Sequence, residues 1–149
     1  MPSSCFEIDV TVPPAAKILF VAGAVLVDAD GRLLICQRPP GKAFAGLWEF
    51  PGGKMEAGET PEATLVRELN EELGILTKPS CFSPLTFASH HYADMGLHVV
   101  MPLFVCRVWQ GVASAREGQK LAWVEPGALY SYSFVAADVP LLPLVRQLL

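Results

Sequence analysis

The stretch 53–75 reads GKMEAGETPEATLVRELNEELGI and decides how the rest of the sequence is interpreted. A glycine-bounded turn precedes Glu68, Glu71 and Glu72, whose spacing of i, i+3 and i+4 places three carboxylates on one side of a helix. Carboxylates packed this closely repel one another unless water or a cation screens their charge. The stretch therefore predicts an acidic helix face that is either solvated or cation-binding.

The helix is signalled at both of its ends. Thr60 suits the N-cap and Pro61 the first helical position, while Gly74 suits the position just after the last turn. Roughly opposite the carboxylates runs an apolar stripe that would pack on a sheet. This stripe consists of Leu65, Val66, Leu69 and Leu73. We therefore expect one face of the helix to be buried while the acidic face borders a cleft.

The same stretch resembles the Nudix box, G-x5-E-x7-R-E-U-x-E-E-x-G-U, in which U is an aliphatic residue. Its fixed positions are matched by Gly53, Glu59, Arg67, Glu68, Leu69, Glu71, Glu72, Gly74 and Ile75. An ordinary surface helix could share the glutamate spacing, but the glycine turn, Glu59, Arg67 and the common register favour the functional interpretation. The resemblance to the Nudix hydrolase family implies an α/β fold with a mixed β-sheet sandwiched between α-helices. It also implies a Mg²⁺-dependent hydrolase of nucleoside diphosphates linked to another group.

The resemblance further implies roles for individual residues. Mg²⁺, for which Mn²⁺ is a possible substitute, prefers oxygen ligands. The implied ligands are the backbone carbonyl of Gly52 and the carboxylates of Glu68, Glu71, Glu72 and Glu117. These glutamates and Lys54, a cation placed to hold a phosphate oxygen, form the expected catalytic set. Gly53, Glu59 and Arg67 are expected to support the site, the last two as an ion pair that fixes the loop on the helix.

The remaining sequence predicts one domain at residues 17–149 after an N-terminal arm at 1–16, with a short edge strand at 6–12. The apolar, β-branched run 18–28 predicts a strand covered on both faces, and Asp30-Gly31 a tight turn into a hairpin partner at 32–37. A turn is expected at 51–53, further strands at 48–50, 82–88, 97–109 and 121–124, and a closing helix at 141–149. Strands mixed with two helices favour an α/β sandwich.

Composition narrows the class of partner. Apolar residues make up 52% of the 149 residues, which is typical of a globular core. The net charge of −4 disfavours binding to a nucleic acid polymer, and the longest apolar run is too short to cross a membrane. Cys5, Cys36, Cys81 and Cys106 form no C-x-x-C pair, so free thiols in a reducing cytosol are expected. The sequence thus indicates a cytoplasmic protein, monomer or homodimer, whose partner is a small-molecule nucleoside triphosphate.

The similarity to MutT-type members of the family continues beyond the box. It runs through Gln37-Arg38, the turn at 109–111 and the Glu117-Gly118-Gln119 loop, and covers roughly residues 18–148. It implies the 8-oxo-dGTP diphosphatase reaction, in which water attacks the β-phosphorus and a nucleoside monophosphate and pyrophosphate are released. The implied role is to remove oxidised precursors from the nucleotide pool.

The base-recognition segment departs from that pattern. MutT-type members present an Asn within P-A-N-x-P, whereas this chain has Asp138. A carboxylate only accepts hydrogen bonds, so it suits the N7–H of an 8-oxo purine but not the O6 of the same base. The N4 amine of cytosine suits an ionised Asp138 directly, which leaves a CTP- or dCTP-type substrate as an alternative. Another nucleotide diphosphatase activity of the family, on dinucleotides or ADP-sugars, is a further alternative. Asp138 could equally serve only as a cap at the start of the terminal helix.

Other candidates for substrate contact follow from residue type. Arg38, at a strand end, could meet phosphate or sugar, and Tyr92, Phe87 and Phe44 could stack on a base. The three histidines form no metal set, and His98 is expected to be structural or a pocket wall. The alternative of a different class is a non-catalytic nucleotide-sensing Nudix module, but such modules usually carry a damaged box.

Overall fold

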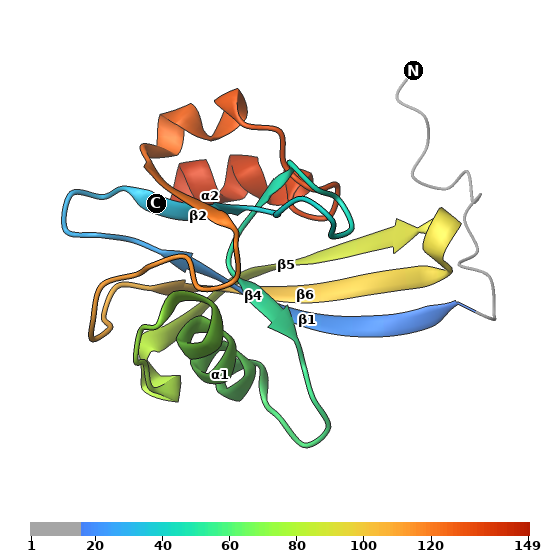
Figure 1. Ribbon diagram of the computed structural model, residues 1–149, viewed down its shortest axis with the longest axis horizontal. Helices are drawn as coiled ribbons and strands as arrows, with labels where there is room; N and C mark the ends of the chain where they lie inside the picture. The colour runs from blue at the N-terminus through green and yellow to red at the C-terminus, as the bar shows by residue number, and fades with distance from the viewer. Residues whose placement is uncertain (1–15) are drawn as a thin grey trace.

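The computed structural model describes residues 16–149, which form two β-sheets with a helix on either side (Figure 1). The first sheet has the order β4-β1-β6-β5, with strands Gly52–Lys54, Lys17–Leu26, Leu97–Cys106 and Phe82–Tyr92. The second has the order β3-β2-β7, with strands Trp48–Glu49, Leu33–Gln37 and Lys120–Val124. The N-terminal arm and the strand expected at 6–12 lie outside the described residues.

The first sheet is mixed and the second is antiparallel. Strand β1 runs parallel to β6 and antiparallel to β4, while β5 is antiparallel to β6. In the second sheet β2 is antiparallel to both of its neighbours. The expected α/β fold, with a mixed sheet between helices, is confirmed, and a small second sheet is added to it.

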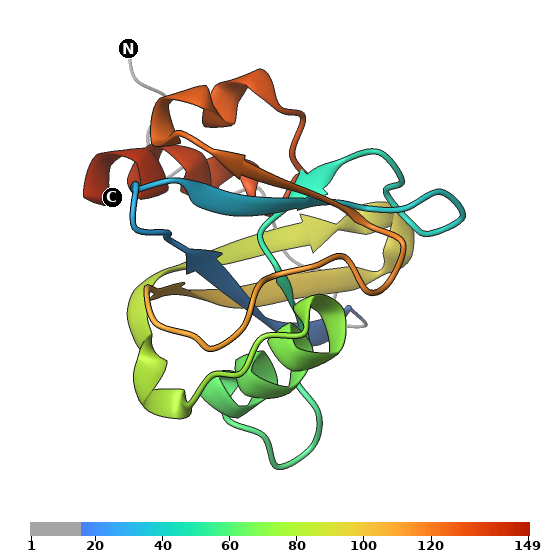
Figure 2. The same ribbon diagram turned by 60° about the vertical axis from the view of Figure 1, so that its left-hand side comes forward.

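Two α-helices and four short 3₁₀-helices complete the described part of the chain. These are α1 (Pro61–Leu73), α2 (Leu142–Leu148), η1 (Pro79–Cys81), η2 (Ala93–Met95), η3 (Pro126–Ser131) and η4 (Val139–Leu141). The Thr60 hydroxyl accepts a hydrogen bond from the Ala63 N–H at 3.1 Å, and Gly74 adopts a left-handed φ of 71°. Both predicted caps of α1 are therefore confirmed, and Figure 2 shows α1 and α2 on opposite sides of the sheets.

The hairpin expected between the first two strands is wrong. The turn forms, since Gly31 has a φ of 77° and its N–H donates to the Asp28 carbonyl, but β1 and β2 enter different sheets. Their pairing is limited to one bridge, between Val27 and Leu33. A strand has two edges, and those of β1 are already taken by β4 and β6, so β2 pairs elsewhere.

Three expected boundaries shift for related reasons. The segment expected as a turn at 51–53 supplies strand β4, because Gly52 and Gly53 lie opposite Gly23 and Ala22 of β1. The strand expected at 97–109 ends at Cys106, and the one expected at 82–88 continues to Tyr92. Pairing with β6 extends β5 past a stretch of polar residues that shows no apolar pattern of its own.

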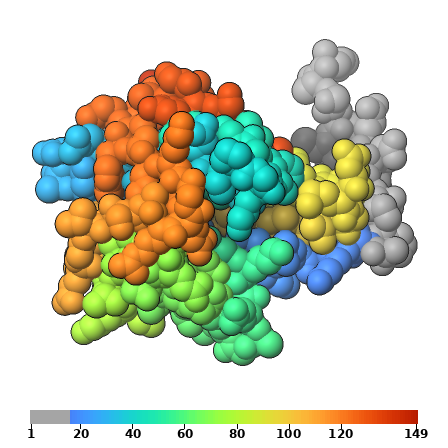
Figure 3. Space-filling view, viewed as in Figure 1, coloured from blue at the N-terminus to red at the C-terminus, as the bar shows by residue number. Residues whose placement is uncertain are grey.

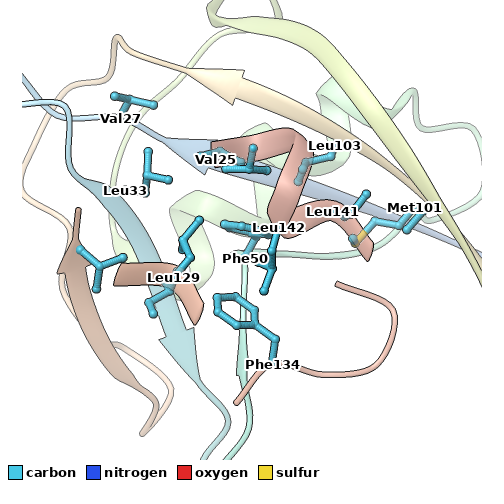
Figure 4. Packing of buried hydrophobic residues seen from close by; sticks show 14 of the residues in the cluster. Val25, Val27, Leu33, Phe50, Met101, Leu103, Leu129, Phe134, Leu141 and Leu142 are labelled. Carbon is cyan, nitrogen blue, oxygen red and sulfur yellow. The ribbon is translucent and has the colours of Figure 1, made fainter. Parts of the chain in front are cut away.

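Two apolar clusters lie on opposite faces of β1. Odd-numbered residues such as Val25 join β2, β6, β7 and α2 in one cluster, part of which Figure 4 shows around Phe50, Leu103 and Leu142. Even-numbered residues such as Ala24 pack instead with Leu65, Leu69 and Leu73 of α1, all fully buried. This burial fixes α1 on the first sheet and leaves its acidic face toward the second.

Three of the four cysteines lie within the described residues. Cys36 and Cys106 are buried, Cys81 is half-buried, and all three are free thiols; Cys5 lies outside the described residues. Within residues 16–149, no helix has the length and apolar character needed to traverse a bilayer.

Candidate active site

The approach to the site is shaped by two glycines in β4. Gly52 has a φ of 154°, and a Cβ at this position would collide with the Ala22 carbonyl oxygen. A Cβ at Gly53 would overlap the carboxyl group of Glu68. At Gly52 only glycine lets the β4 backbone lie against β1, while the missing side chain at Gly53 leaves room for the Glu68 carboxyl group. This close approach brings the backbone beside a carboxylate from the first turns of α1.

Arg67 ties the loop before α1 to the helix. Its Nε and Nη2 donate to the two carboxylate oxygens of Glu59 at 2.8 Å each, and Nη2 also donates to the Lys54 carbonyl at 3.1 Å. Glu59 accepts two further bonds, from Thr64 Oγ1 and from the Glu56 N–H. The hydrogen bonds from Arg67 lower the pKa of Glu59 to about 2. The expected ion pair is present, and it locks the loop against the helix.

A cleft of about 290 Å³ lies between the acidic face of α1 and the second sheet. Its lining combines carboxyl groups from distant parts of the chain with two basic side chains, Arg38 and Lys42. The carboxyl groups belong to Glu49, Glu68, Glu72, Glu117 and Asp138. Gly52 and Gly53 form part of the wall next to Glu68. The structure thus brings Gly52, Glu68, Glu72 and Glu117 of the predicted ligand set together.

Burial gives these acids unusual electrostatics. Burial, reinforced by the negative charges of Glu68, Glu117 and Glu49, raises the pKa of Glu72 to about 9. Burial also raises the pKa of Glu49, with Arg38 opposing that effect. Cys36, which lines the same cleft, has its thiol pKa raised by burial and by the charges of Glu72 and Glu49. The thiol therefore stays protonated near neutral pH.

Two residues of the predicted catalytic set lie away from the cleft lining. The side chain of Glu71 is 54% exposed, and its Oε2 lies 3.5 Å from Nη1 of Arg67. Lys54 is exposed at the end of β4, where its carbonyl accepts from Arg67. Of the predicted carboxylates, Glu68 and Glu72 face the cleft most directly from α1, since both are largely shielded from solvent.

The far end of the cleft is built by the second sheet and the C-terminal segment. Arg38 follows β2, and its Nη1 donates to Glu49 of β3 at 3.0 Å, while its Nε donates to the Ala43 carbonyl. Sequence reasoning missed Glu49. The signal that could have found it is an acid between Trp48 and Phe50, inside a short strand, where a charge normally needs a partner.

Asp138 is almost wholly buried and lines this end of the cleft. Its Oδ2 accepts a hydrogen bond from the Phe50 N–H at 3.0 Å, and its side chain makes no capping bond to η4. Asp138 thus occupies the N-cap position of η4, the short helix before α2, without capping it through its side chain. Burial raises its pKa to about 7, and the charge of Glu49 adds to that effect. Near neutral pH, the protonated and ionised forms are thus both populated.

None of the three aromatic candidates lines the cleft. Tyr92 lies close to the Asp138 segment, because its hydroxyl accepts from the Ala137 N–H at 3.1 Å, and its ring packs on Phe44 at 5.3 Å. Phe87 is 65% exposed on β5 and does not line the cleft. His98 also lies outside the lining: it stacks on His91 and its Nε2 lies 2.7 Å from Ser89 Oγ.

The donor atoms of the cleft suit a hard divalent cation. They include the carboxylate oxygens of Glu68, Glu72 and Glu117, and a bound cation would oppose the burial and the neighbouring negative charges that raise the pKa of Glu72. Within residues 16–149, no group of three His, Cys, Asp or Glu side chains is already arranged to hold a metal ion. Ions of this kind are commonly held by one or two carboxylates together with substrate phosphates and water, and Glu68 and Glu72 fit that pattern.

Comparison with known proteins settles the family. The family model described as the NUDIX domain matches residues 18–145. The chain belongs to the Nudix family. Nudix hydrolases act on nucleotides and generally need divalent metal ions, and they are enzymes of the pyrophosphohydrolase type. The protein is therefore an enzyme, and the alternative of a non-catalytic module is not supported.

Individual Nudix relatives cover most of the chain. A CTP pyrophosphohydrolase from Escherichia coli is 38% identical over 80% of this chain and 85% of its own length. An 8-oxo-dGTP diphosphatase from Haemophilus influenzae is 35% identical over 85% of this chain and 90% of its own. Among solved structures, the E. coli ORF135 protein superposes with a TM-score of 0.76 at 34% identity, covering 89% of this chain and 91% of its own. MutT of Aliivibrio salmonicida or Vibrio cholerae gives 0.74 at 30% identity, covering 89% of this chain and all of its own.

Proposed function

We propose that the protein is a Mg²⁺-dependent nucleoside triphosphate pyrophosphohydrolase that acts in sanitising the nucleotide pool. The observation that carries the proposal is the grouping of Glu68, Glu72 and Glu117 in one cleft with the Gly52–Gly53 backbone. Mg²⁺ held by these glutamates and the Gly52 carbonyl would neutralise the phosphates of the substrate. Glu71 would join the set by turning away from Arg67. Its Oε2 lies 3.5 Å from Nη1 of Arg67, which is a weak contact.

The reaction proposed is hydrolysis at the β-phosphorus. The oxygen of water forms a bond to this atom, and the bond between the β-phosphorus and the oxygen bridging to the α-phosphorus breaks. The monophosphate leaves with the bridging oxygen, and pyrophosphate keeps the oxygen from water. Glu59 and Arg67 hold the loop that carries the glycine backbone, and Arg38 and Lys42 supply the positive charge at the far end of the cleft.

The proposed substrate is 8-oxo-dGTP, with CTP or dCTP as the second candidate. Asp138 supports both, because its carboxyl group has a pKa of about 7. The protonated form can donate to O6 of the oxidised purine, while the ionised form accepts from its N7–H or from the N4 amine of cytosine. A relative with each activity matches most of the chain, which is why both candidates are retained.

The proposal is tested by a substrate panel with Mg²⁺, comparing kcat/KM for 8-oxo-dGTP, dGTP, CTP, dCTP and ADP-ribose. We expect pyrophosphate release from at least one triphosphate, at least a 100-fold loss of kcat in Glu72→Gln, and no such loss in Glu125→Gln, an exposed acid outside the cleft. Reaction in ¹⁸O-water should place the label in pyrophosphate. Label in the monophosphate would refute attack at the β-phosphorus, and no turnover of any nucleotide would refute the proposed activity.

A further inference from the structure

The loop 111–119 is bonded to the C-terminal end of α1. The last carbonyl groups of a helix have no partner within the helix. In α1 the Leu73 carbonyl accepts from the Ser114 N–H at 3.0 Å, and the Glu72 carbonyl accepts from the Arg116 N–H at 3.1 Å. In Figure 3 this orange loop lies directly on the green surface of α1. The loop therefore closes the helix end and carries Glu117 to the cleft.

One side chain of this loop joins two acids of the cleft. Nε2 of Gln119 donates to the Glu72 carbonyl at 3.0 Å, and its Oε1 accepts from the Glu117 N–H at 2.8 Å. Gln119 is half-buried and itself lines the cleft. An amide is suited to this position because it donates and accepts at once. The bridge spans 47 residues of sequence, from α1 to the loop before β7.

The local backbone makes the bridge possible. Gly118, between Glu117 and Gln119, has a φ of 75°, a conformation that residues with a side chain disfavour. This value turns the chain back, so that the Gln119 side chain meets the N–H of Glu117 two residues earlier. On its C-terminal side, Gln119 is followed at once by β7, where Lys120 pairs with Gln37 of β2. The bridge is therefore anchored on the second sheet.

We propose that Gln119 is a positioning residue that fixes the carboxylates of Glu117 and Glu72 relative to each other. The inference rests on the proposed function, in which both carboxylates serve one phosphate-bound cation. The C-terminal turn of α1 packs on the first sheet, whereas the loop that carries Glu117 leads into the second. The distance between Glu72 and Glu117 therefore depends on the bonds that connect the helix to the loop. Side chains that hold metal-binding groups in place typically change metal affinity or activity by about 10- to 100-fold when removed.

The test replaces Gln119 by methionine, which has similar length but neither donates nor accepts strongly. In Gln119→Met we expect kcat to fall about 10- to 100-fold and the half-saturating Mg²⁺ concentration to rise by a similar factor. The KM for the nucleotide should change much less, because the bridge acts on the acids rather than on the base. Gln147→Met in α2, an exposed glutamine, is the matched control and should behave as the intact protein.

Two measurements need no turnover. Hydrogen exchange at the Glu117 amide, followed by NMR, should be slow in the intact protein and in Gln147→Met, and at least about 10-fold faster in Gln119→Met. Titration with Mn²⁺ followed by EPR should show weaker binding in Gln119→Met than in the intact protein or in Gln147→Met. Gln119→Asn keeps the amide group but is one methylene shorter. It should lose the protection of the Glu117 amide and the Mn²⁺ affinity to the same extent, which would show that the length of the side chain matters as well as its polarity.

The outcomes distinguish this inference from the proposed function. If the intact protein hydrolyses no triphosphate, the proposed function is refuted. Hydrogen exchange at the Glu117 amide and Mn²⁺ binding then still test the positioning role of Gln119, because neither measurement needs turnover. An unprotected Glu117 amide in the intact protein would overturn the inference. So would a Gln119→Met variant that loses protection but keeps the kcat, Mg²⁺ dependence and Mn²⁺ affinity of the intact protein.

Discussion

Phe50 and Asp138 are joined by a 3.0 Å hydrogen bond from the Phe50 N–H to Oδ2 of the carboxyl group, across 88 residues of sequence. The segment that carries Asp138 also runs along β3, with bonds from the Trp48 N–H to the Ser133 carbonyl and from the Val135 N–H to the Trp48 carbonyl. One carboxylate oxygen of Asp138, Oδ2, is therefore already hydrogen-bonded within the protein. The other, Oδ1, is the atom left for a ligand in the cleft.

Replacing Asp138 by asparagine should change the choice of base. The amide oxygen can keep the bond from Phe50, while the added NH₂ group can donate to O6 of an oxidised guanine. We expect the ratio of kcat/KM for 8-oxo-dGTP over dCTP to rise by about 10-fold or more in Asp138→Asn. Asp94→Asn, an exposed acid in η2, is the control. An unchanged ratio would show that Asp138 does not contact the base.

The same variant should alter how stability depends on pH. Because burial raises the pKa of Asp138 from 3.8 to about 7, the folded protein favours its protonated form. The contribution of Asp138 to stability is therefore complete below pH 3.8 and is lost as the pH rises through 7. The Tm of the intact protein minus that of Asp138→Asn should fall across this window and level off above about pH 8. A difference that stays constant from pH 4 to 8 would contradict the raised pKa.

Glu59 should show the opposite dependence on pH. Hydrogen bonds from Arg67 lower its pKa from 4.5 to about 2, so the folded protein favours the ionised form. Its contribution to stability is present above pH 4.5 and is lost as the pH falls toward 2. Thermal melts should place Glu59→Gln below the intact protein at pH 7, with the gap closing on acidification. Glu125→Gln should show no such gap; equal melting of Glu59→Gln and the intact protein at pH 7 would count against the ion pair.

Gly53→Ala should separate folding from metal binding. The new Cβ would overlap the carboxyl group of Glu68, which can move because it ends a flexible side chain. We expect a small change in Tm but at least about a 10-fold rise in the half-saturating Mg²⁺ concentration. The control is Gly127→Ala, where a Cβ meets no atom within 4 Å. Normal Mg²⁺ dependence in Gly53→Ala would show that the position of Glu68 is not critical.

The parts of the molecule predicted from sequence are those specified locally. The caps of α1 and the burial of Leu65, Leu69 and Leu73 follow from spacing within one helix, and the structure confirms them. The placement of Glu68 and Glu72 on the cleft follows from the same periodicity. The predictions that were wrong concern strands whose pairing partners are distant in the sequence. The separation of β1 from β2 depends on β4 and β6, which occupy both edges of β1.

Long-range contacts also explain the site residues that the sequence did not reveal. Glu49 is half-buried beside Arg38, which follows another strand, and this pairing cannot be inferred from its neighbours in the chain. Phe87 belongs to neither apolar cluster and is exposed, although an aromatic residue in a strand is usually part of the core. Likewise, the sequence around Gln119 does not indicate its hydrogen bonds to the Glu117 N–H and the Glu72 carbonyl, because Glu72 is distant in the chain.

The assignment of β1 and β2 to different sheets has a consequence for how this enzyme can change over time. The acids and glycines proposed to handle phosphate sit on α1 and β4, against the first sheet. Asp138, proposed to contact the base, lies on the segment docked on the second sheet, and Arg38 and Glu49 at the same end of the cleft belong to that sheet or follow directly from it. Mutations that retune the nucleoside preference would therefore fall on the second sheet and the segment docked on it, while most of the proposed hydrolytic residues lie on α1 and β4; the two sheets still share the apolar cluster around Val25. Such a division allows new substrates to be acquired while the underlying chemistry is inherited intact.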